Sequence, residues 1–576
     1  MERKHNIKYA KGFAYTMAAN FIATSIRQVA VMCFLSISIA TAKAQGEGTK
    51  AENLQHNSWP TETNDSLLHR NYNYLADSEP WLTSCNTAAL TRFKADNIST
   101  ARISLTSGHG GLTNFSDSRN MLEAGAEAAS YFRINQRTVV AGSISYTNFT
   151  GKEMGGSAFI SPDRKPFDIE EDSLTNLGKK HLDTYRLTGG VGFDICHGIA
   201  VGARLDYTAA NYAKYKDLRH KNKMLDMTLA IGATVPIGKH LHIGANYLYR
   251  RNTESVAFNT YGRNEKVYKS FINYGPFIGR VEQFEGNGLT EKGREMPMVD
   301  DYNGAALQID ITAGDITFAN EITAVHRVGY YGRKSPYTIT FAHHESNLYG
   351  YSGKVLLREN RNLHLLSVTL DAENLENSFS TYREKSNDNG AYFYEYYDDV
   401  KTANKLWING EAAYTLHIGV KGELPAWTVK AHYRWMHRKQ TAYEYPYYRR
   451  QKIDNRETGL SITRNLTLRR GVLSLNAEGA FISGKGKPFE DLTFTEPSDK
   501  QIPPPTMEAW LYREYRWLTA PQYTLGGSAK YTFVLPAIHT ATYVEASARH
   551  RKANATNEFC TGRDCTTLAV AIGCHF

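Results

Sequence analysis

From about residue 98 to its last residue, the chain alternates apolar and polar side chains with a period of two residues. Between Leu473 and Phe481, for example, apolar residues or glycine occupy every second position, and Ser474, Asn476 and Glu478 lie between them. Successive side chains of a β-strand point to opposite faces, so this period is typical of strands with one apolar and one polar face. The pattern predicts an all-β protein.

Two kinds of connection alternate between these segments. The short ones are turns near residues 135–136, 196–198, 238–239, 313–315, 360–362, 469–471 and 535–536, with a looser turn from Gly419 to Ala426. The long ones cover roughly residues 150–181, 212–221, 255–303, 332–345, 377–402, 441–453, 484–518 and 552–563. Soluble β-sandwiches also alternate apolar and polar residues, but long loops at one end and short turns at the other are typical of outer-membrane barrels. We therefore expect a transmembrane antiparallel β-barrel over residues 98–576.

The segments begin near residues 98, 121, 137, 182, 199, 222, 240, 304, 316, 346, 363, 404, 427, 455, 472, 521, 538 and 564, which makes 18 strands. The weakly patterned first strand and the stretch from Val267 to Tyr274, which could add a strand, leave a range of 16 to 20. An even number places both ends of the barrel on the periplasmic side. Strands longer than the roughly 9–11 residues that cross a bilayer should protrude outward.

The last segment ends in an aromatic residue. Leu568, Val570 and Ile572 share a face with the terminal Phe576. Such a strand resembles the terminal-aromatic signal that the outer-membrane assembly machinery recognises, which implies that this machinery is a partner.

The first 44 residues differ from the rest in composition. They hold six Lys or Arg and one acidic residue, and an apolar run from Val29 to Ala40 leads to Ala42-Lys43-Ala44. A basic start, a short apolar run and an A-x-A site are typical of a secretory signal peptide, which we expect over residues 1–44, with Met17 as an alternative start. Its removal leaves 67 − 6 = 61 basic and 58 − 1 = 57 acidic residues, so the formal net charge falls from +9 to +4. The remaining charge gives no support for a nucleic-acid partner.

Hydropathy limits the kind of membrane protein. The mean hydropathy is −0.47, and after residue 44 no run of about 20 apolar residues occurs, as a membrane-spanning helix requires. A helical membrane protein is therefore excluded. A barrel is not, because a strand exposes its lipid-facing side chains only at every second residue.

Residues 45–97 precede the first strand and contain Trp59, Tyr72, Tyr74 and Trp81. So many aromatic side chains are unusual for a free tail. Two interpretations remain open. The segment is either a periplasmic extension packed under the barrel or a plug inserted into it from below.

The polar face of the strands is expected to line the lumen. Its charged candidates are Arg204, Asp206, Arg250, Glu321, Arg327, Asp371, Glu373, Glu411, Lys430, His432, Arg434, Glu478, Glu545 and Arg549, and Asn246, Asn409 and Asn476 lie on the same face. A barrel of this size is wide enough for an aqueous channel unless something fills it. The candidates are therefore solvated or salt-bridged wall residues, or a subset of them forms a solute path.

The sequence resembles two families of outer-membrane proteins. The stretch Ser84-Cys85-Asn86-Thr87-Ala88-Ala89-Leu90 resembles, over about seven residues, the Asn-Pro-Ala-Ala-Leu element of the long-chain fatty-acid and hydrocarbon channels of the outer membrane, with Thr87 in place of proline. This resemblance implies a channel for hydrophobic substrates with an N-terminal plug. The architecture and the lead-in rich in Trp, Asn and Ala resemble an uncharacterised outer-membrane barrel family of Bacteroidota, which implies no particular function.

The sequence contains no H-E-x-x-H, G-x-S-x-G or Walker motif, and it predicts no catalytic, cofactor or metal site. Cys560 and Cys565 are spaced to close a disulfide in the last long connection, in an oxidising compartment. We expect a barrel of the cell outer membrane that lets a solute pass or supports its uptake as an accessory to a larger complex. A structural or adhesive surface barrel and an outer-membrane hydrolase are the alternatives. Outer-membrane lipid, lipopolysaccharide and a transporter or surface lipoprotein are the expected partners.

Overall fold

The computed structural model describes residues 67–92, 97–171, 176–262, 265–286, 288–292, 294–535, 540–554 and 562–575. The predicted signal peptide, the alternative start at Met17, the first part of the 45–97 segment, Cys560 and Phe576 lie outside the described residues. Within the described part of the chain, no helix is both long and apolar enough to cross a membrane.

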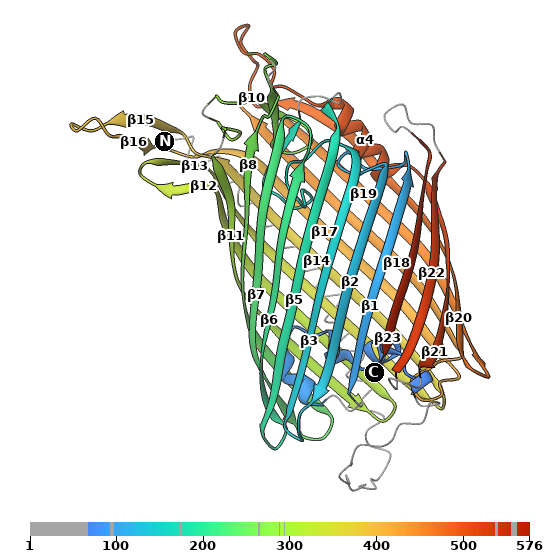
Figure 1. The fold of residues 1–576 in the computed structure, drawn as a ribbon. Coiled ribbons are helices and arrows are strands. Elements are labelled where there is room, and N and C mark those ends of the chain that lie inside the picture. Colours follow the sequence, from blue (N-terminus) through green and yellow to red (C-terminus); the bar gives the residue numbers. More distant parts are fainter. Residues whose placement is uncertain are drawn as a thin grey trace.

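Eighteen antiparallel strands form one closed sheet (Figure 1). They are β1 (Ile98–Gly110), β2 (Asn120–Arg133), β3 (Thr138–Met154), β5 (Gly178–Cys196), β6 (Ile199–Lys214), β7 (Arg219–Ile237), β8 (Leu241–Asn259), β11 (Glu295–Ala313), β12 (Ile316–Ser335), β13 (Thr338–Glu359), β14 (Asn362–Phe379), β17 (Val400–Ile418), β18 (Trp427–Glu444), β19 (Tyr447–Leu468), β20 (Gly471–Thr493), β21 (Gln522–Leu535), β22 (Thr540–Ala553) and β23 (Asp564–His575). Each strand pairs with the next, and β1 pairs with β23 from Thr100↔His575 to Gly110↔Cys565, which closes the barrel. The predicted barrel and its 18 strands are confirmed.

The two faces of the wall differ as the period-two pattern requires. Leu568, Val570 and Ile572 of β23 point outward and expose 56%, 55% and 61% of their surface. Closed barrels expose such an apolar belt to lipid. The alternate positions point inward, where Ala571 is only 4% exposed.

Several long connections are shorter than the sequence indicated. Between β12 and β13 only Pro336 and Tyr337 lie outside the strands, and between β18 and β19 only Tyr445 and Pro446 do. The predicted loops 332–345 and 441–453 are therefore wrong, and short and long connections do not alternate strictly. The reason is that strands continue beyond the lipid belt, where polar residues replace the apolar ones and end the pattern without ending the hydrogen bonding.

Two connections at the long-loop end fold together into an insert. It contains a three-stranded sheet of β4 (Asp168–Glu171), β9 (Lys269–Asn273) and β10 (Gly279–Gln283). The stretch Val267–Tyr274 thus forms a strand, but in this sheet and not in the barrel. Ile169 and Ile272 of the insert pack in one core with Met298 and Tyr331 of the wall. We call residues 155–171 and 265–286 the outer insert.

Three further elements frame the barrel. Helix α4 (Glu508–Thr519) lies at the rim, where Trp510 and Leu511 are fully buried, and the hairpin of β15 (Tyr382–Ser386) and β16 (Tyr392–Tyr396) projects from the same end (Figure 1). At the opposite end, the N-terminal segment forms α3 (Tyr72–Ser78), η1 (Pro80–Thr83) and η2 (Thr87–Arg92), drawn in blue near the short turns. Both ends of the lumen therefore contain additional chain.

Candidate functional site

The N-terminal segment is bound to inward-facing side chains of the wall. The indole Nε1 of Trp81 donates a hydrogen bond to Asp310 Oδ2 at 2.7 Å, and Arg92 forms an ion pair with the same oxygen at 3.2 Å. The hydroxyl of Ser84 donates to Glu321 Oε2 at 2.6 Å. The predicted lumen residue Glu321 therefore holds the segment rather than facing open water.

Asn86 is at the centre of this contact. Its Nδ2 donates to Gln308 Oε1 at 3.0 Å, and Gln308 Nε2 donates in turn to Asn246 Oδ1 at 2.7 Å. Asn86 is 1% exposed. Because buried polar groups are stable only when they are hydrogen-bonded, this network holds the segment at this level of the wall. Asn246 was a sequence candidate, whereas Gln308 was missed.

Glycines on the inner face of the wall make room for η2. They are Gly190 and Gly192 of β5, Gly202 of β6, Gly232 of β7 and Gly244 of β8, and each would bring an added Cβ within 3.0 Å of Asn86, Thr87, Ala88 or a wall residue. At Gly202 the Cβ would lie 2.3 Å from the Ala88 nitrogen. We call this patch the glycine seat. Four consecutive strands carry glycine at inward positions, and glycine within a strand often marks a site where another backbone segment approaches closely. This sequence pattern could have indicated the seat.

Cys85 lies in the same contact. Its thiol is 3.3 Å from Glu321 Oε1 and 3.4 Å from Asn246 Oδ1. Burial and the adjacent Glu321 carboxylate raise the pKa of Cys85 to about 12. The thiol is consequently protonated and poorly reactive while the segment is seated.

The predicted lumen-lining residues lie on the inner face, and all except Glu321 take part in ion pairs. The pairs are Arg204–Asp206 at 2.8 Å, Arg250–Asp226 at 2.6 Å, Arg327–Glu373 at 3.1 Å, Arg434–Glu411 at 2.9 Å, Lys430–Glu411 at 4.0 Å, His432–Glu457 at 3.0 Å, Arg549–Glu478 at 2.6 Å, Glu545–Arg102 at 3.7 Å and Asp371–Arg164. The wall thus carries charges of both signs that largely neutralise each other locally.

Three of these residues bind the outer insert. The Arg164 guanidinium contacts both Asp371 and Glu373, and Arg327 Nη1 donates to the Arg164 carbonyl oxygen at 3.2 Å. Arg327 is also paired with Asp300 at 2.7 Å. The alternation of the strands indicated these wall residues, but it gave no sign that a loop residue completes the cluster.

The outer insert carries buried carboxyl groups. Ser157 Oγ donates to Asp168 Oδ1 at 2.6 Å, and Asn273 Nδ2 donates to Glu170 Oε1 at 2.7 Å. Burial raises the pKa of Asp168 to about 7, against the hydrogen bonds from Ser157 and the Ile169 amide, and it holds the pKa of Glu170 well above its ordinary range. These carboxyl groups were missed because a polar stretch in a long connection indicates an exposed loop.

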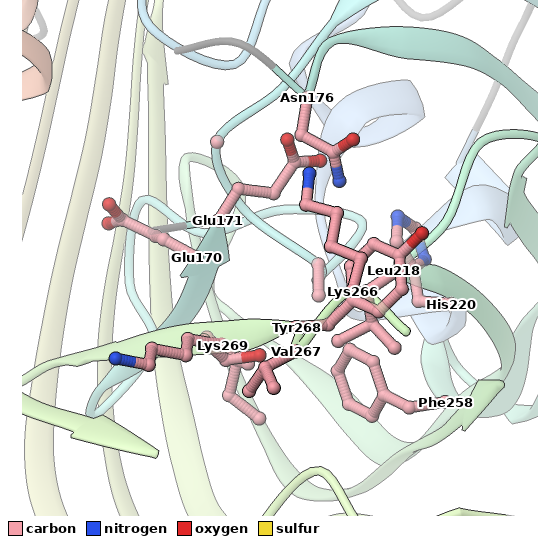
Figure 2. A pocket seen from close by; sticks show the side chains of 14 residues that line it. Glu170, Glu171, Asn176, Leu218, His220, Phe258, Lys266, Val267, Tyr268 and Lys269 are labelled. Atoms are coloured by element: carbon pink, nitrogen blue, oxygen red, sulfur yellow. The ribbon is translucent and has the colours of Figure 1, made fainter. Parts of the chain in front are cut away.

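A cavity of about 220 Å³ lies between the insert and the wall. Figure 2 shows Glu170, Glu171 and Asn176 on one side of it and the ring of Phe258 on the other. The cavity is smaller than the roughly 300–1,000 Å³ of pockets for drug-sized ligands. It therefore suits only a small solute or water.

No metal centre is found in the described ranges, where no group of three or more His, Cys, Asp or Glu side chains is arranged to bind one. Cys565 forms no disulfide with another described residue. Since Cys560 lies outside those residues, the Cys560–Cys565 bond stays a prediction.

A closed barrel with an apolar outer belt and a charged inner face is a membrane-spanning β-barrel protein. Residues 87–576 match the family described as "Family of unknown function (DUF6850)", and the chain belongs to this family. No curated protein matches the chain.

Solved structures of outer-membrane proteins are similar in outline. They include BauA, the ferric preacinetobactin receptor from Acinetobacter baumannii, with 9% identity over 84% of this chain and 80% of that chain and a TM-score of 0.37. The outer membrane transporter YddB from Escherichia coli has 8% identity over 84% and 81% and a TM-score of 0.38. A mutant of the monoaromatic hydrocarbon channel TodX has 9% identity over 85% and 92% and a TM-score of 0.29. Likeness at this level says nothing about what this chain transports, and the resemblance of Ser84–Leu90 to the hydrocarbon channels stays a prediction.

Proposed function

We propose that this protein is an outer-membrane barrel that lets a small polar solute pass and that uses its own N-terminal segment as the gate. The observation that carries the proposal is the contact of residues 81–92 with the glycine seat and with Asp310, Gln308 and Glu321 of the wall. The apolar belt, the even strand number and the short turns at the end where both termini of the barrel lie support the outer-membrane location.

The chemistry of the contact favours a gate over a permanent closure. The segment is held by hydrogen bonds, by the Arg92–Asp310 ion pair and by a contact of Asp77 with His417 at 3.1 Å. Its apolar contacts with the wall form two small clusters, Leu82 and Leu90 against Val139 and Tyr74 against three leucines of β13 and β14. Polar contacts exchange readily for hydrogen bonds to water, so their net contribution to binding is modest. The ion-paired wall remains wetted once the segment leaves.

A single substitution in the glycine seat tests this function. Gly202→Leu places a side chain where the Ala88 backbone lies, so we expect the segment to be displaced and small sugars to enter proteoliposomes faster than with the unaltered protein. Gly189→Leu is the matched control, because a Cβ at Gly189 meets nothing within 4 Å. Swelling of the proteoliposomes measures the rates.

The outcomes separate the hypotheses. Faster swelling with Gly202→Leu alone supports the gate. Equal, slow swelling of both folded variants, as in liposomes without protein, contradicts solute passage through this lumen.

A second candidate function is attachment of a partner at the cell surface. The hairpin β15–β16 projects from the rim (Figure 1), and its Tyr392 is 64% exposed. Exposed aromatic groups of this kind occur at binding surfaces. Deletion of residues 382–396 would abolish binding of a surface partner and leave solute entry unchanged, which distinguishes this role from the first.

A further inference from the structure

A row of three lysines crosses neighbouring strands on the outward face of the barrel. The register sets Lys439 of β18 opposite Lys452 of β19, and Lys452 opposite Lys487 of β20. All three side chains are exposed. Like charges directly opposite each other destabilise a sheet, so folding of the barrel gives no reason for this arrangement. We call these residues the lysine row.

The charges of the row are not neutralised by the protein. None of the three lysines forms an ion pair with a carboxylate of a described residue, and neither do the exposed Arg450, Arg456 and Lys485 around them. Asp454, on the same face, is already bound to His437 at 2.6 Å. Elsewhere on the wall, Lys223–Glu295 at 3.5 Å, Arg251–Asp301 at 3.1 Å and Lys401–Glu376 at 3.0 Å are paired. Unlike these cations, the lysines of the row have no carboxylate partner among the described residues.

The regular strand register creates the row, and a β-bulge follows it directly on the long-loop side. The register is continuous from Leu468↔Gly471 to Lys452↔Lys487 and shifts only beyond this pair, between Lys452 and Arg450. Gly486 has a φ of +144°, and a Cβ there would lie 2.2 Å from the Lys452 carbonyl oxygen. Gln451 Nε2 donates to the Pro488 carbonyl oxygen at 2.7 Å and holds the bulge in place. Bulges are common next to sites of function, and this one lies at the edge of the three aligned cations.

The lysine row lies just beyond the lipid belt. On β18, Tyr433 and Trp435 stack at 5.8 Å, and Phe481 of β20 contacts Tyr523 of β21 at 5.0 Å. Aromatic girdles mark the boundary between hydrocarbon and headgroups. The lysines follow these rings on the same outward face, toward the long-loop end, at the level where lipid headgroups lie.

We propose that the lysine row is a binding site for a phosphorylated glycolipid headgroup of the outer leaflet. The long-loop end of an outer-membrane barrel faces outward, so its headgroup level is that of the outer leaflet. Lysine ammonium groups bind phosphate as point charges, and three of them in line suit a headgroup with more than one phosphate. The acyl chains of the same lipid would lie against the apolar belt below. This inference rests on the outer-membrane location but not on solute passage.

Charge-matched double variants of the full-length protein in detergent test the site. Lys452→Gln/Lys487→Gln should weaken binding of bisphosphorylated lipid A roughly thirtyfold, because each basic residue near an anionic headgroup contributes about a factor of five. Lys223→Gln/Lys401→Gln removes the same charge from paired positions and should change binding less than about threefold. Native mass spectrometry or lipid titration measures the affinity.

Two further measurements decide the interpretation. Salt should weaken binding to the unaltered protein and have a smaller effect on Lys452→Gln/Lys487→Gln, since the contact is electrostatic. The thermal midpoint of that variant should be equal or higher in detergent without lipid, because like-charge repulsion is removed. Equal loss of lipid A binding in both double variants would overturn the proposal. Displacement of lipid A by an equal concentration of inorganic pyrophosphate would also overturn it, because the row would then be a site for a soluble anion.

Discussion

At the scale of single residues, the contact between the N-terminal segment and the wall rests on a few polar atoms. Asn86 and Gln308 form one amide pair at 3.0 Å, and Cys85 lies beside it against Glu321. Because the pair is buried, loss of Gln308 removes one of the hydrogen bonds of Asn86 together with the link to Asn246, and loss of a buried hydrogen bond typically costs about 1–3 kcal/mol. The state of the segment can therefore be followed at Cys85.

Thiol labelling of Cys85 is the prediction at this scale. In a variant with Cys85 as its only cysteine, a maleimide should react at about pH 8 roughly 1,000-fold more slowly than with a free thiol, since the thiolate fraction falls tenfold per unit of raised pKa. Gln308→Ala should accelerate labelling by releasing the segment. A control that retains only Cys196, which is exposed, should react at the same rate with and without Gln308→Ala. Fast labelling of Cys85 in the unaltered contact would show that the segment is not seated.

At the scale of elements, the outer insert depends on pH through its buried carboxyl groups. Burial raises the pKa of Asp168 from 3.8 to about 7, so the folded insert favours the protonated form. Stability from this group is fully present below about pH 4 and is lost as pH rises through about 7. Glu170, whose pKa is also raised by burial, acts in the same direction.

Hydrogen exchange checks this pH dependence. Corrected for the intrinsic rate, the amides of β9 should exchange faster at about pH 8 than at about pH 5.5. Asp168→Asn keeps an acceptor for Ser157 and should reduce the difference. Glu395→Gln, in the projecting hairpin, should leave it unchanged. Protection that is the same at both pH values in the unaltered chain would contradict a raised pKa at Asp168.

The sequence predicts the barrel strands well and the insert poorly, for one physical reason. A wall strand separates lipid from lumen, so its composition alternates, as in Leu473–Phe481, and the predicted and observed strand starts at residues 98, 199, 316 and 427 coincide. The strands β4 and β9 are only 4 and 5 residues long and are buried at nearly every position, partly against the wall, so no alternation marks them. The charged lumen residues were found by the same alternation, but their partners, such as Arg164, come from loops.

At the scale of the whole molecule, the inner face of the wall carries ion-paired charges, and chain segments at the two ends of the lumen fill it differently. The outer insert shares one large apolar core with the upper wall, including Tyr331 and Met298, whereas the N-terminal segment combines polar contacts with two small apolar clusters. Apolar burial stabilises more than exchangeable hydrogen bonds do. We therefore expect the N-terminal segment, and not the insert, to be the part that moves.

Single-channel recording in planar bilayers tests this account most directly. The intact protein should remain closed or conduct rarely, and deletion of residues 45–97 should give defined, long-lived conductance steps, because the contacts at Asp310, Gln308 and Glu321 are lost while all 18 strands remain. Heat-modifiable gel mobility verifies that the deleted form is folded. A folded deletion variant with the same silent record as the intact protein would contradict the N-terminal segment as the gate of this barrel.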